Sequence, residues 1–94
     1  MGIKTCVIID PDSTVNEVLK SFLQEVGIAK VEYFDDGLKA WGWLRANPEP
    51  DIIIQEWRLP KLTGPLLLQR IRQHGFLTVQ IVIISSLITG LSGT

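Results

Sequence analysis

The sequence predicts an α/β domain: a three-layer, doubly wound sheet of parallel strands with helices on both faces. Uncharged runs of β-branched residues, such as residues 52–54 and 81–84, alternate with segments whose apolar residues recur at helical spacing. Runs that are apolar throughout are typical of parallel strands buried on both faces. The order β-α-β-α-β-α-β within 94 residues fits a single domain.

The first strand is expected at Ile3–Ile9, followed by a helix whose N-cap is Asp12 or Ser13. Gly27 is expected to end this helix in a left-handed conformation. The apolar residues at helical spacing predict the face that packs on the core; they are Val15, Val18, Leu19, Phe22 and Val26.

A second strand is predicted at Lys30–Phe34, followed by a helix that Asp35 or Asp36 caps. This second helix is expected to end at Asn47-Pro48, because the residue before a proline disfavours helical geometry. Its predicted core face consists of Leu38, Trp41 and Leu44.

The third strand is predicted at Asp51–Gln55, and a loop over residues 57–62 follows it. Thr63 is expected to cap a third helix with Pro65 in its first turn, where a missing N–H costs nothing. Leu67, Leu68 and Ile71 are predicted to form the apolar face of this helix, and His74-Gly75 is predicted to end it. The fourth strand is predicted at Val79–Ser85.

Polar residues follow three of these strands directly. In a parallel sheet the chemistry collects at the carboxyl ends of the strands. We therefore expect Asp10, Glu56 and Ser85 to lie together if the first, third and fourth strands are neighbours.

The pattern D-x-D-x-T at residues 10–14 allows one enzymatic reading. It resembles the first motif of haloacid-dehalogenase-type phosphatases, in which the first Asp attacks phosphorus and the second is the general acid/base. Asp10 and Asp12 would take these roles, with Ser85 as that family's second motif. A helix begins at once, however, and neither a lysine nor an acidic pair follows Ser85, so the phosphatase is the less favoured alternative.

Residues 50–64, PDIIIQEWRLPKLTG, carry a stronger resemblance. They resemble the third strand and following loop of response-regulator receiver domains of the CheY-like superfamily. The stretches VIIDPDST, DDGLKAW, TGPLLLQRIRQHG and IVIISS are similar to other parts of this family in the same order, over about residues 3–88. The resemblance implies a flavodoxin-like sheet of order 2-1-3-4, without the family's usual fifth strand and last helix, and a role in two-component (phosphorelay) signal transduction.

The resemblance also implies roles for individual residues. In the family, an Asp after the third strand accepts a phosphoryl group from a histidine kinase, and acids after the first strand help to hold Mg²⁺. Here the phosphoacceptor-equivalent residue is Glu56, the acidic pocket is Asp10 with Glu56, and Ser85 keeps the hydroxyl switch position. A metal would bind through Asp10, Glu56 and the backbone carbonyl of Arg58.

Three functional positions depart from the family pattern. Glu56 has an extra methylene group, Pro11 replaces the second acid, and the sequence stops before the family's lysine. These departures favour a non-enzymatic, phosphorylation-independent receiver that acts through protein–protein contacts, with no cofactor or only weakly bound Mg²⁺. The alternative is a working Mg²⁺-dependent phosphoacceptor. Glu56 would either imitate the phosphorylated state or be merely tolerated, and Arg58 would either pair with Glu56 or point to solvent.

Other notable side chains have structural explanations. Cys6 lies in an apolar run and is expected in the core, and His74 at a helix C-terminus suits the helix dipole. Trp41 and Trp43 lie on different faces of their helix, so we expect one to pack and the other to be partly exposed. Trp57 is expected at the rim of the acidic pocket.

The composition limits the partners and the compartment. A net charge of −1 without a basic patch argues against nucleic acid and membrane surfaces. A single cysteine, with no targeting or membrane-spanning segment, predicts a cytoplasmic protein. The expected partners are a histidine kinase or a downstream signalling protein. The uncharged fourth strand is expected at the edge of the sheet, where it could pair with another chain. This predicts a homodimer through the fourth strand or the C-terminal segment, unless the sequence is a fragment of a longer receiver.

Overall fold

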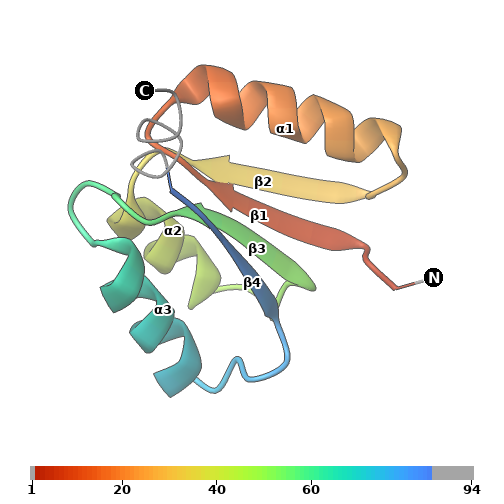
Figure 1. Cartoon of the computed structure of the whole chain (residues 1–94). Coiled ribbons are helices and arrows are strands. Elements are labelled where there is room, and N and C mark those ends of the chain that lie inside the picture. The colour runs from red at the N-terminus through yellow and green to blue at the C-terminus, as the bar shows by residue number, and fades with distance from the viewer. Residues whose placement is uncertain (1, 86–94) are drawn as a thin grey trace.

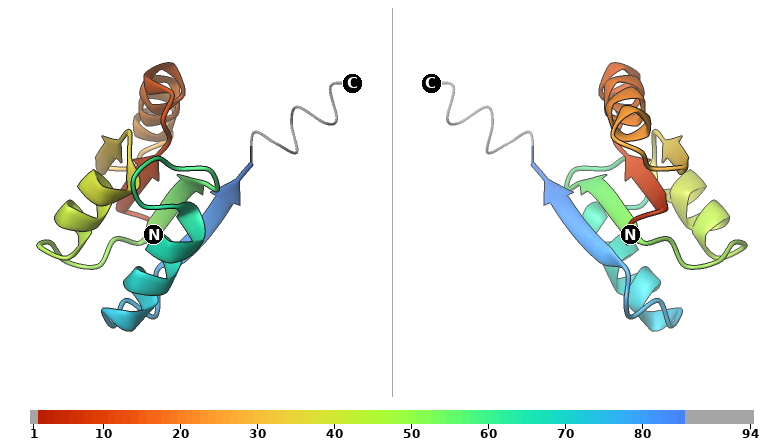
Figure 2. Two further views of the ribbon diagram at one scale, coloured as in Figure 1. Left: turned by 90° about the vertical axis from the view of Figure 1, so that its left-hand side faces the viewer. Right: turned by 90° about the vertical axis from the view of Figure 1, so that its right-hand side faces the viewer.

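The computed structural model describes residues 2–85 and contains one four-stranded parallel sheet of order β2-β1-β3-β4 (Figure 1). The elements in chain order are β1 (Thr5–Ile9), α1 (Ser13–Glu25), β2 (Lys30–Phe34), α2 (Gly37–Leu44), β3 (Ile52–Glu56), α3 (Gly64–Gln73) and β4 (Gln80–Ile84). Helix α1 covers one face of the sheet and α2 with α3 cover the other (Figure 2). The predicted three-layer fold and strand order are confirmed.

The helix ends follow the signals in the sequence. Asp12 caps α1 and Asp36 caps α2, each through a carboxylate that accepts a backbone N–H. Thr63 is the N-cap residue of α3, but its side chain makes no capping hydrogen bond. Gly27 and Gly75 both have φ of 104°, the left-handed conformation that ends α1 and α3.

The two faces of the sheet bury apolar clusters of different size. On the α2–α3 side, the buried cluster comprises Val7, Ile9, Ala40, Leu44, Ile53, Leu59, Leu62, Leu67, Ile71 and Val79. On the α1 side, the smaller buried cluster comprises Cys6, Ile8 and Val31, with Leu19 and Leu23 of α1 packed against them. The prediction that Cys6 is a core residue is confirmed, and burial raises the pKa of its thiol to about 11.

The predicted core face of α1 is partly wrong. Val18, Phe22 and Val26 are exposed, whereas Leu19 and Leu23 face the sheet and Asn16 is fully buried. The reason is that α1 packs mainly against β1 and β2, so the flank of its apolar surface that carries Val18 and Phe22 does not rest on the sheet.

The predicted core face of α2 is also partly wrong. Leu38 is exposed, and Ala40 is buried with Leu44 instead. Trp41 and Trp43 are both half-buried against the core, so the prediction of one packed and one exposed ring fails. Phe34 contacts Trp43, and the ring of His74 lies edge-on to that of Trp41, which explains why both tryptophans find partners.

Strand β4 forms one edge of the described sheet. It pairs with β3 from Gln80 to Ile84, and Val82, Ile83 and Ile84 remain exposed. The predicted contribution of the C-terminal segment, residues 86–94, to a homodimer lies outside the described residues. No helix within residues 2–85 is long and apolar enough to cross a membrane.

Candidate functional site

The candidate site lies at the carboxyl ends of β1, β3 and β4. Asp10 follows β1, Glu56 is the last residue of β3, and Ser85 follows β4 directly. The register pairs Ile9 with Gln55 and Glu56 with Ile84. Because β3 lies between β1 and β4, these three residues come to one edge of the sheet, as the sequence predicted.

Asp10 is held in place by the chain on both sides of it. Its backbone N–H donates to Phe34 O at 3.1 Å, and its carboxylate Oδ1 accepts the backbone N–H of Asp12 at 2.8 Å. Burial raises the pKa of the Asp10 carboxyl, the N–H of Asp12 opposes this rise, and the negative charges of Glu56 and then Asp12 add to it. The carboxylates of Asp10 and Glu56 therefore interact across the site.

The Glu56 carboxylate is buried and turned back toward its own chain. Its Oε2 atom accepts the N–H of Trp57 at 2.5 Å and the N–H of Arg58 at 3.3 Å. The N–H of Trp57 also donates to Ile84 O at 2.9 Å, which joins β3 to β4 at the site. The carboxylate thus accepts both backbone N–H groups that follow it at the end of β3.

Pro11 and Asp12 do not add a ligand group to this arrangement. Pro11 is exposed and has no polar side chain, and the Asp12 carboxylate accepts the N–H of Thr14 at 2.9 Å as the cap of α1. Asp12 therefore has a structural task, which weakens its assignment as a general acid/base in the phosphatase alternative. Within residues 2–85 there is no group of three or more His, Cys, Asp or Glu side chains that could hold a metal ion.

Asn16 supports the site and was not predicted. Its fully buried side chain donates from Nδ2 to Asp10 O at 2.7 Å and to Phe34 O at 3.4 Å. It thereby ties α1 to the ends of β1 and β2 next to the site. The signal in the sequence is weak, because a single Asn among polar helix residues reads as solvent-exposed.

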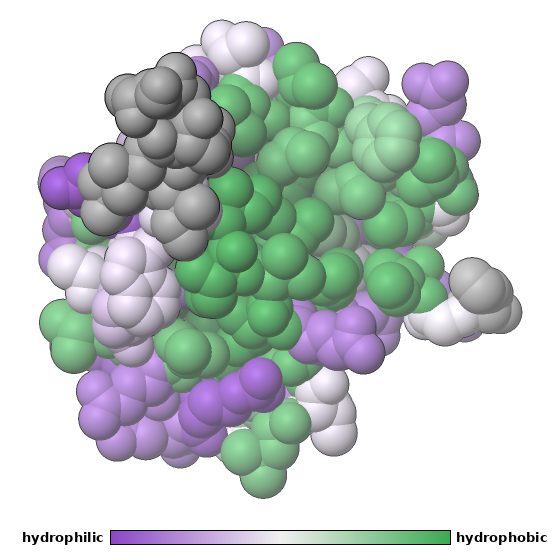
Figure 3. Space-filling view, in the orientation of Figure 1, coloured by the Kyte–Doolittle hydropathy of each residue, from purple (hydrophilic) through white to green (hydrophobic). Residues whose placement is uncertain are grey.

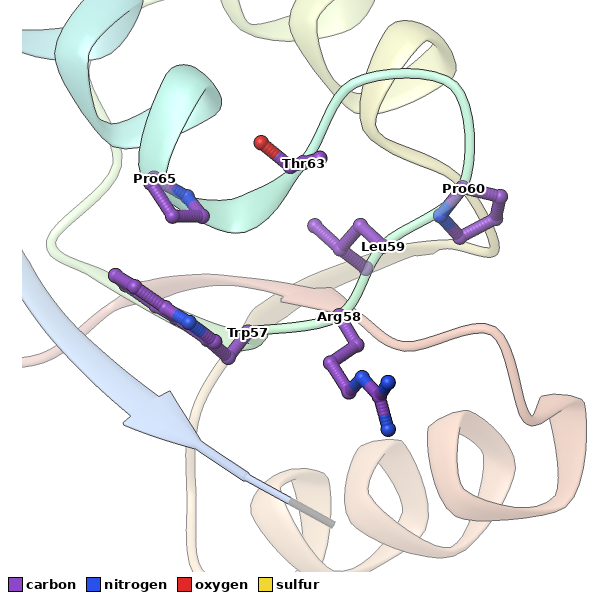
Figure 4. A pocket seen from close by; sticks show the side chains of 6 residues that line it. All are labelled: Trp57, Arg58, Leu59, Pro60, Thr63 and Pro65. Carbon is purple, nitrogen blue, oxygen red and sulfur yellow. The ribbon is translucent and has the colours of Figure 1, made fainter. Parts of the chain in front are cut away.

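The loop after Glu56 forms a shallow hollow beside the site (Figure 4). The residues that line it are Trp57, Arg58, Leu59, Pro60, Thr63 and Pro65. Trp57 is 42% exposed, which supports its predicted place at the rim. The Arg58 side chain is exposed and points away from Thr63 and Pro65.

Buried contacts fix this loop to β3 and α3. Gln55 donates from Nε2 to Gly64 O at 3.0 Å, and the N–H of Gly64 donates to Trp57 O at 3.1 Å. A Cβ atom at Gly64 would lie 2.6 Å from Trp57 O, so the start of α3 and the site loop are in direct backbone contact. The position of the Glu56 carboxylate therefore depends on how α3 begins.

The sequence profile of the family described as "Response regulator receiver domain" matches residues 6–89. The chain belongs to this family. Receiver domains are signalling domains of two-component systems, and they interact with histidine kinases and other proteins. The resemblance inferred from residues 50–64 is thus confirmed over residues 6–89.

Relatives and solved structures agree with this assignment. The receiver is 27% identical over 81 residues to chemotaxis protein CheY1 of Helicobacter pylori, covering 85% of this chain and 65% of the relative. It is 32% identical over 66 residues to chemotaxis protein CheY-3 of Vibrio cholerae, covering 70% of this chain and 50% of that protein. The receiver thus spans at most 65% of the length of these two curated relatives.

Two solved structures illustrate the shared fold. The receiver domain of the Francisella response regulator 1452 is 27% identical, with a TM-score of 0.78 over 95% of this chain and 76% of that one. The receiver domain of the histidine kinase CKI1 from Arabidopsis thaliana, solved in complex with Mg²⁺ and BeF₃⁻, has a TM-score of 0.78 at 20% identity, over 88% of this chain and 66% of that one. At that identity the second likeness concerns the fold alone.

Proposed function

We propose that this receiver signals through protein–protein contacts and does not take up a phosphoryl group at Glu56. The proposal rests on one observation above others: the Glu56 carboxylate accepts the N–H groups of Trp57 and Arg58. A phosphoryl oxygen that accepted hydrogen bonds from these N–H groups would have to displace the carboxylate first. The partner would be a histidine kinase or a downstream signalling protein.

The reach of the side chain supports the same conclusion. A glutamate places its carboxylate about one C–C bond, roughly 1.5 Å, beyond that of an aspartate, and an error of about 1 Å in the position of a reacting group can reduce a rate on the order of 100-fold. The carboxylate of Glu56 is moreover engaged by its own backbone and buried. A negative charge held permanently at this place would make the signalling state independent of a kinase reaction.

We further propose that Mg²⁺ binds this site weakly. Mg²⁺ requires nearly octahedral oxygen coordination and, when bound, would offset the charge of a carboxylate and a phosphoryl group. The chain offers the Asp10 and Glu56 carboxylates and the backbone carbonyl of Arg58, but Pro11 supplies no ligand. Both carboxylates already accept backbone N–H groups, which competes with coordination.

A Mg²⁺-dependent phosphoacceptor is the second candidate. The observation that favours it is the mutual repulsion of Asp10 and Glu56, whose negative charge contributes to the raised pKa of Asp10. A divalent cation bound between the two carboxylates would relieve their repulsion. In this case Glu56 would have to leave the N–H groups of Trp57 and Arg58 before reacting.

Incubation with acetyl phosphate and Mg²⁺, and separately with beryllofluoride and Mg²⁺, distinguishes the two candidates. We expect an unchanged intact mass and unchanged tryptophan fluorescence, for which the partly exposed Trp57 beside the site is a natural reporter. A stable adduct with the mass of one phosphoryl group on Glu56 would contradict the proposal.

The double variant Pro11→Asp/Glu56→Asp is the positive control. It shortens the side chain at position 56 and supplies the missing acid, so we expect Mg²⁺ to change its fluorescence at concentrations that leave the native protein unaffected. The single variant Glu56→Gln is the matched negative control, because it keeps the length and removes the charge. A native protein whose fluorescence changes at the same Mg²⁺ concentrations as that of the double variant would show that the native site already binds Mg²⁺.

A further inference from the structure

Helices α2 and α3 lie side by side on one face of the sheet and border a shallow hollow near their C-terminal ends. Trp41 of α2 lines the hollow on one side, and Arg70, Gln73 and His74 of α3 and its C-cap line it on the other. We name these four residues the α2–α3 hollow. Its volume is about 330 Å³, at the lower end of the range of ligand sites.

The α2–α3 hollow is remote from the end of β4, where the described part of the chain stops. Helix α2 contacts β2, and the strand order places β2 and β4 at opposite edges of the sheet. Figure 2 accordingly shows α2 and β4 on opposite sides of the molecule. Both helices are described over their whole length. The shape of the hollow therefore follows from these two helices and not from the segment after residue 85.

Aromatic contacts fix one wall of the α2–α3 hollow. The ring of His74 lies edge-on to the Trp41 ring, with 5.5 Å between the ring centroids, and edge-on to the Phe76 ring at 4.8 Å. Edge-to-face contacts at these distances are favourable. Trp41 is half-buried against the core, and the rest of its surface faces the hollow. The hollow therefore has a preformed apolar wall on which an apolar side chain can pack.

Arg70 brings a permanent positive charge to the α2–α3 hollow. Within residues 2–85 the ion pairs belong to Lys39, and Arg70 makes neither an ion pair nor a side-chain hydrogen bond with another described residue. Arg72, by contrast, donates to Phe76 O at 2.8 Å and to Val79 O at 3.0 Å. The C-terminal end of α3 thus already has a cation that serves its dipole. Arg70 remains available to a carboxylate from outside the chain.

No carboxylate of the two helices competes for Arg70. Neither α2 nor α3 contains Asp or Glu, and residues 57–94 contain four basic residues and no acidic one. Arg45 adds a second cation, because it follows Trp41 by four residues and so lies on the same side of α2. Figure 3 shows hydrophilic residues gathered where α3 ends, at the lower left of the molecule. The charge around the hollow therefore complements a negative partner.

We infer that the α2–α3 hollow binds a short segment of a partner protein in which an Asp or Glu stands next to an apolar residue. The planar fork of N–H donors of Arg70 matches a carboxylate, and the apolar residue packs on Trp41. A nucleic acid fits this surface less well, because its regularly spaced phosphates require a row of cations. The inference goes beyond the proposed function, since it concerns another surface and does not depend on the state of Glu56.

A matched pair of synthetic peptides tests this binding. The probe is an acetylated and amidated peptide with the sequence Asp-Glu-Asp-Phe repeated twice, and its control has Asn-Gln-Asn-Phe repeated twice. Two-dimensional NMR follows the indole N–H signals of the tryptophans. We expect the acidic peptide, at up to about 1 mM, to shift the Trp41 signal until it saturates and to leave the Trp57 signal unchanged. The uncharged peptide should bind at least about tenfold more weakly.

Variants of the protein locate the contact. Arg70→Glu should weaken binding of the acidic peptide at least about tenfold, and Arg70→Lys should weaken it less, because lysine keeps the charge and loses the fork. Lys20→Glu on α1, across the sheet, changes the net charge as much as Arg70→Glu does and should bind like the native protein. Circular dichroism and cooperative unfolding verify that each variant folds. Arg70→Gln replaces Arg70→Glu if the latter does not fold.

Four results would overturn the inference. The first is a Trp41 signal that the acidic peptide leaves unchanged up to the highest concentration, and the second is equal binding of the two peptides. The third is a Lys20→Glu variant that weakens binding as much as Arg70→Glu, which would indicate a diffuse effect of net charge. The fourth is a single-stranded DNA oligonucleotide that binds more tightly than the acidic peptide at the same salt concentration, which would favour a nucleic acid instead.

Discussion

Two glycines of the same helix should respond in opposite directions to the same substitution. At Gly37, the first residue of α2, an added Cβ atom would lie 1.9 Å from Leu62 O and 2.8 Å from Leu62 Cβ. At Gly42, five residues further along α2, nothing lies within 4 Å of the added atom. The pair Gly37→Ala and Gly42→Ala therefore separates the effect of close packing from that of helix propensity.

The geometry fixes the size of the effect. An ordinary contact begins at 3.4 Å, so Leu62 O and the new Cβ atom at position 37 must separate by 1.5 Å, the difference between 3.4 and 1.9 Å. Leu62 is buried, and its loop is tied to α2 by the N–H of Gly37, which donates to Pro60 O at 3.2 Å. Overpacking of this kind destabilises by about 2–3 kcal/mol. In Gly42→Ala the gain in helix propensity should stabilise by about 0.5–1 kcal/mol.

Urea denaturation followed by tryptophan fluorescence measures the change in the free energy of unfolding, and thermal unfolding measures the change in Tm. For a domain of this size, Gly37→Ala should lower Tm by about 10–20 °C and Gly42→Ala should raise it by a few degrees. A Gly37→Ala protein as stable as the native one would refute the reasoning. It would mean that the loop carrying Pro60 and Leu62 moves freely relative to α2.

Three further predictions concern single residues. The pKa of Asp51 is lowered first by the N–H of Lys4 and then by that of Thr5. The stabilisation that this carboxylate gives is therefore present above the ordinary pKa of 3.8 and is lost as the pH falls through the lower folded-state pKa. Asp51→Asn should reduce Tm near neutral pH and flatten the dependence of Tm on pH in that acidic window, and an unchanged pH profile would contradict this. Cys6, with its pKa raised by burial, should react with iodoacetamide far more slowly in the native protein than in urea, as mass spectrometry would show, and equal rates would place the thiol at the surface. Asn16→Ala should destabilise by about 1–3 kcal/mol in urea denaturation, because the Asp10 carbonyl loses a buried donor, and a smaller change would mean that water replaces the amide.

The sequence by itself determined the order and kind of the elements. Uninterrupted β-branched runs specify strands buried on both faces, and Asp12, Asp36, Gly27 and Gly75 mark helix ends through local hydrogen bonds and backbone conformation. The strand ends also placed Asp10, Glu56 and Ser85 at one edge, because parallel strands share the direction of their carboxyl ends. These are properties of neighbouring residues in the chain, so they can be read without knowing the packing.

Only the tertiary structure decided which apolar faces are covered and how the site is arranged. Helical spacing groups Val18 and Phe22 with Leu19, but whether a strand lies beneath each depends on where α1 rests on the sheet. The burial of Asn16 depends likewise on carbonyl groups of Asp10 and Phe34, which come from two other elements. The Glu56 carboxylate accepts the N–H groups of Trp57 and Arg58 in a loop that the N–H of Gly64, at the start of α3, also contacts. The spacing of apolar residues shows which face of a helix or strand is apolar, whereas the burial of that face depends on which distant segment packs against it.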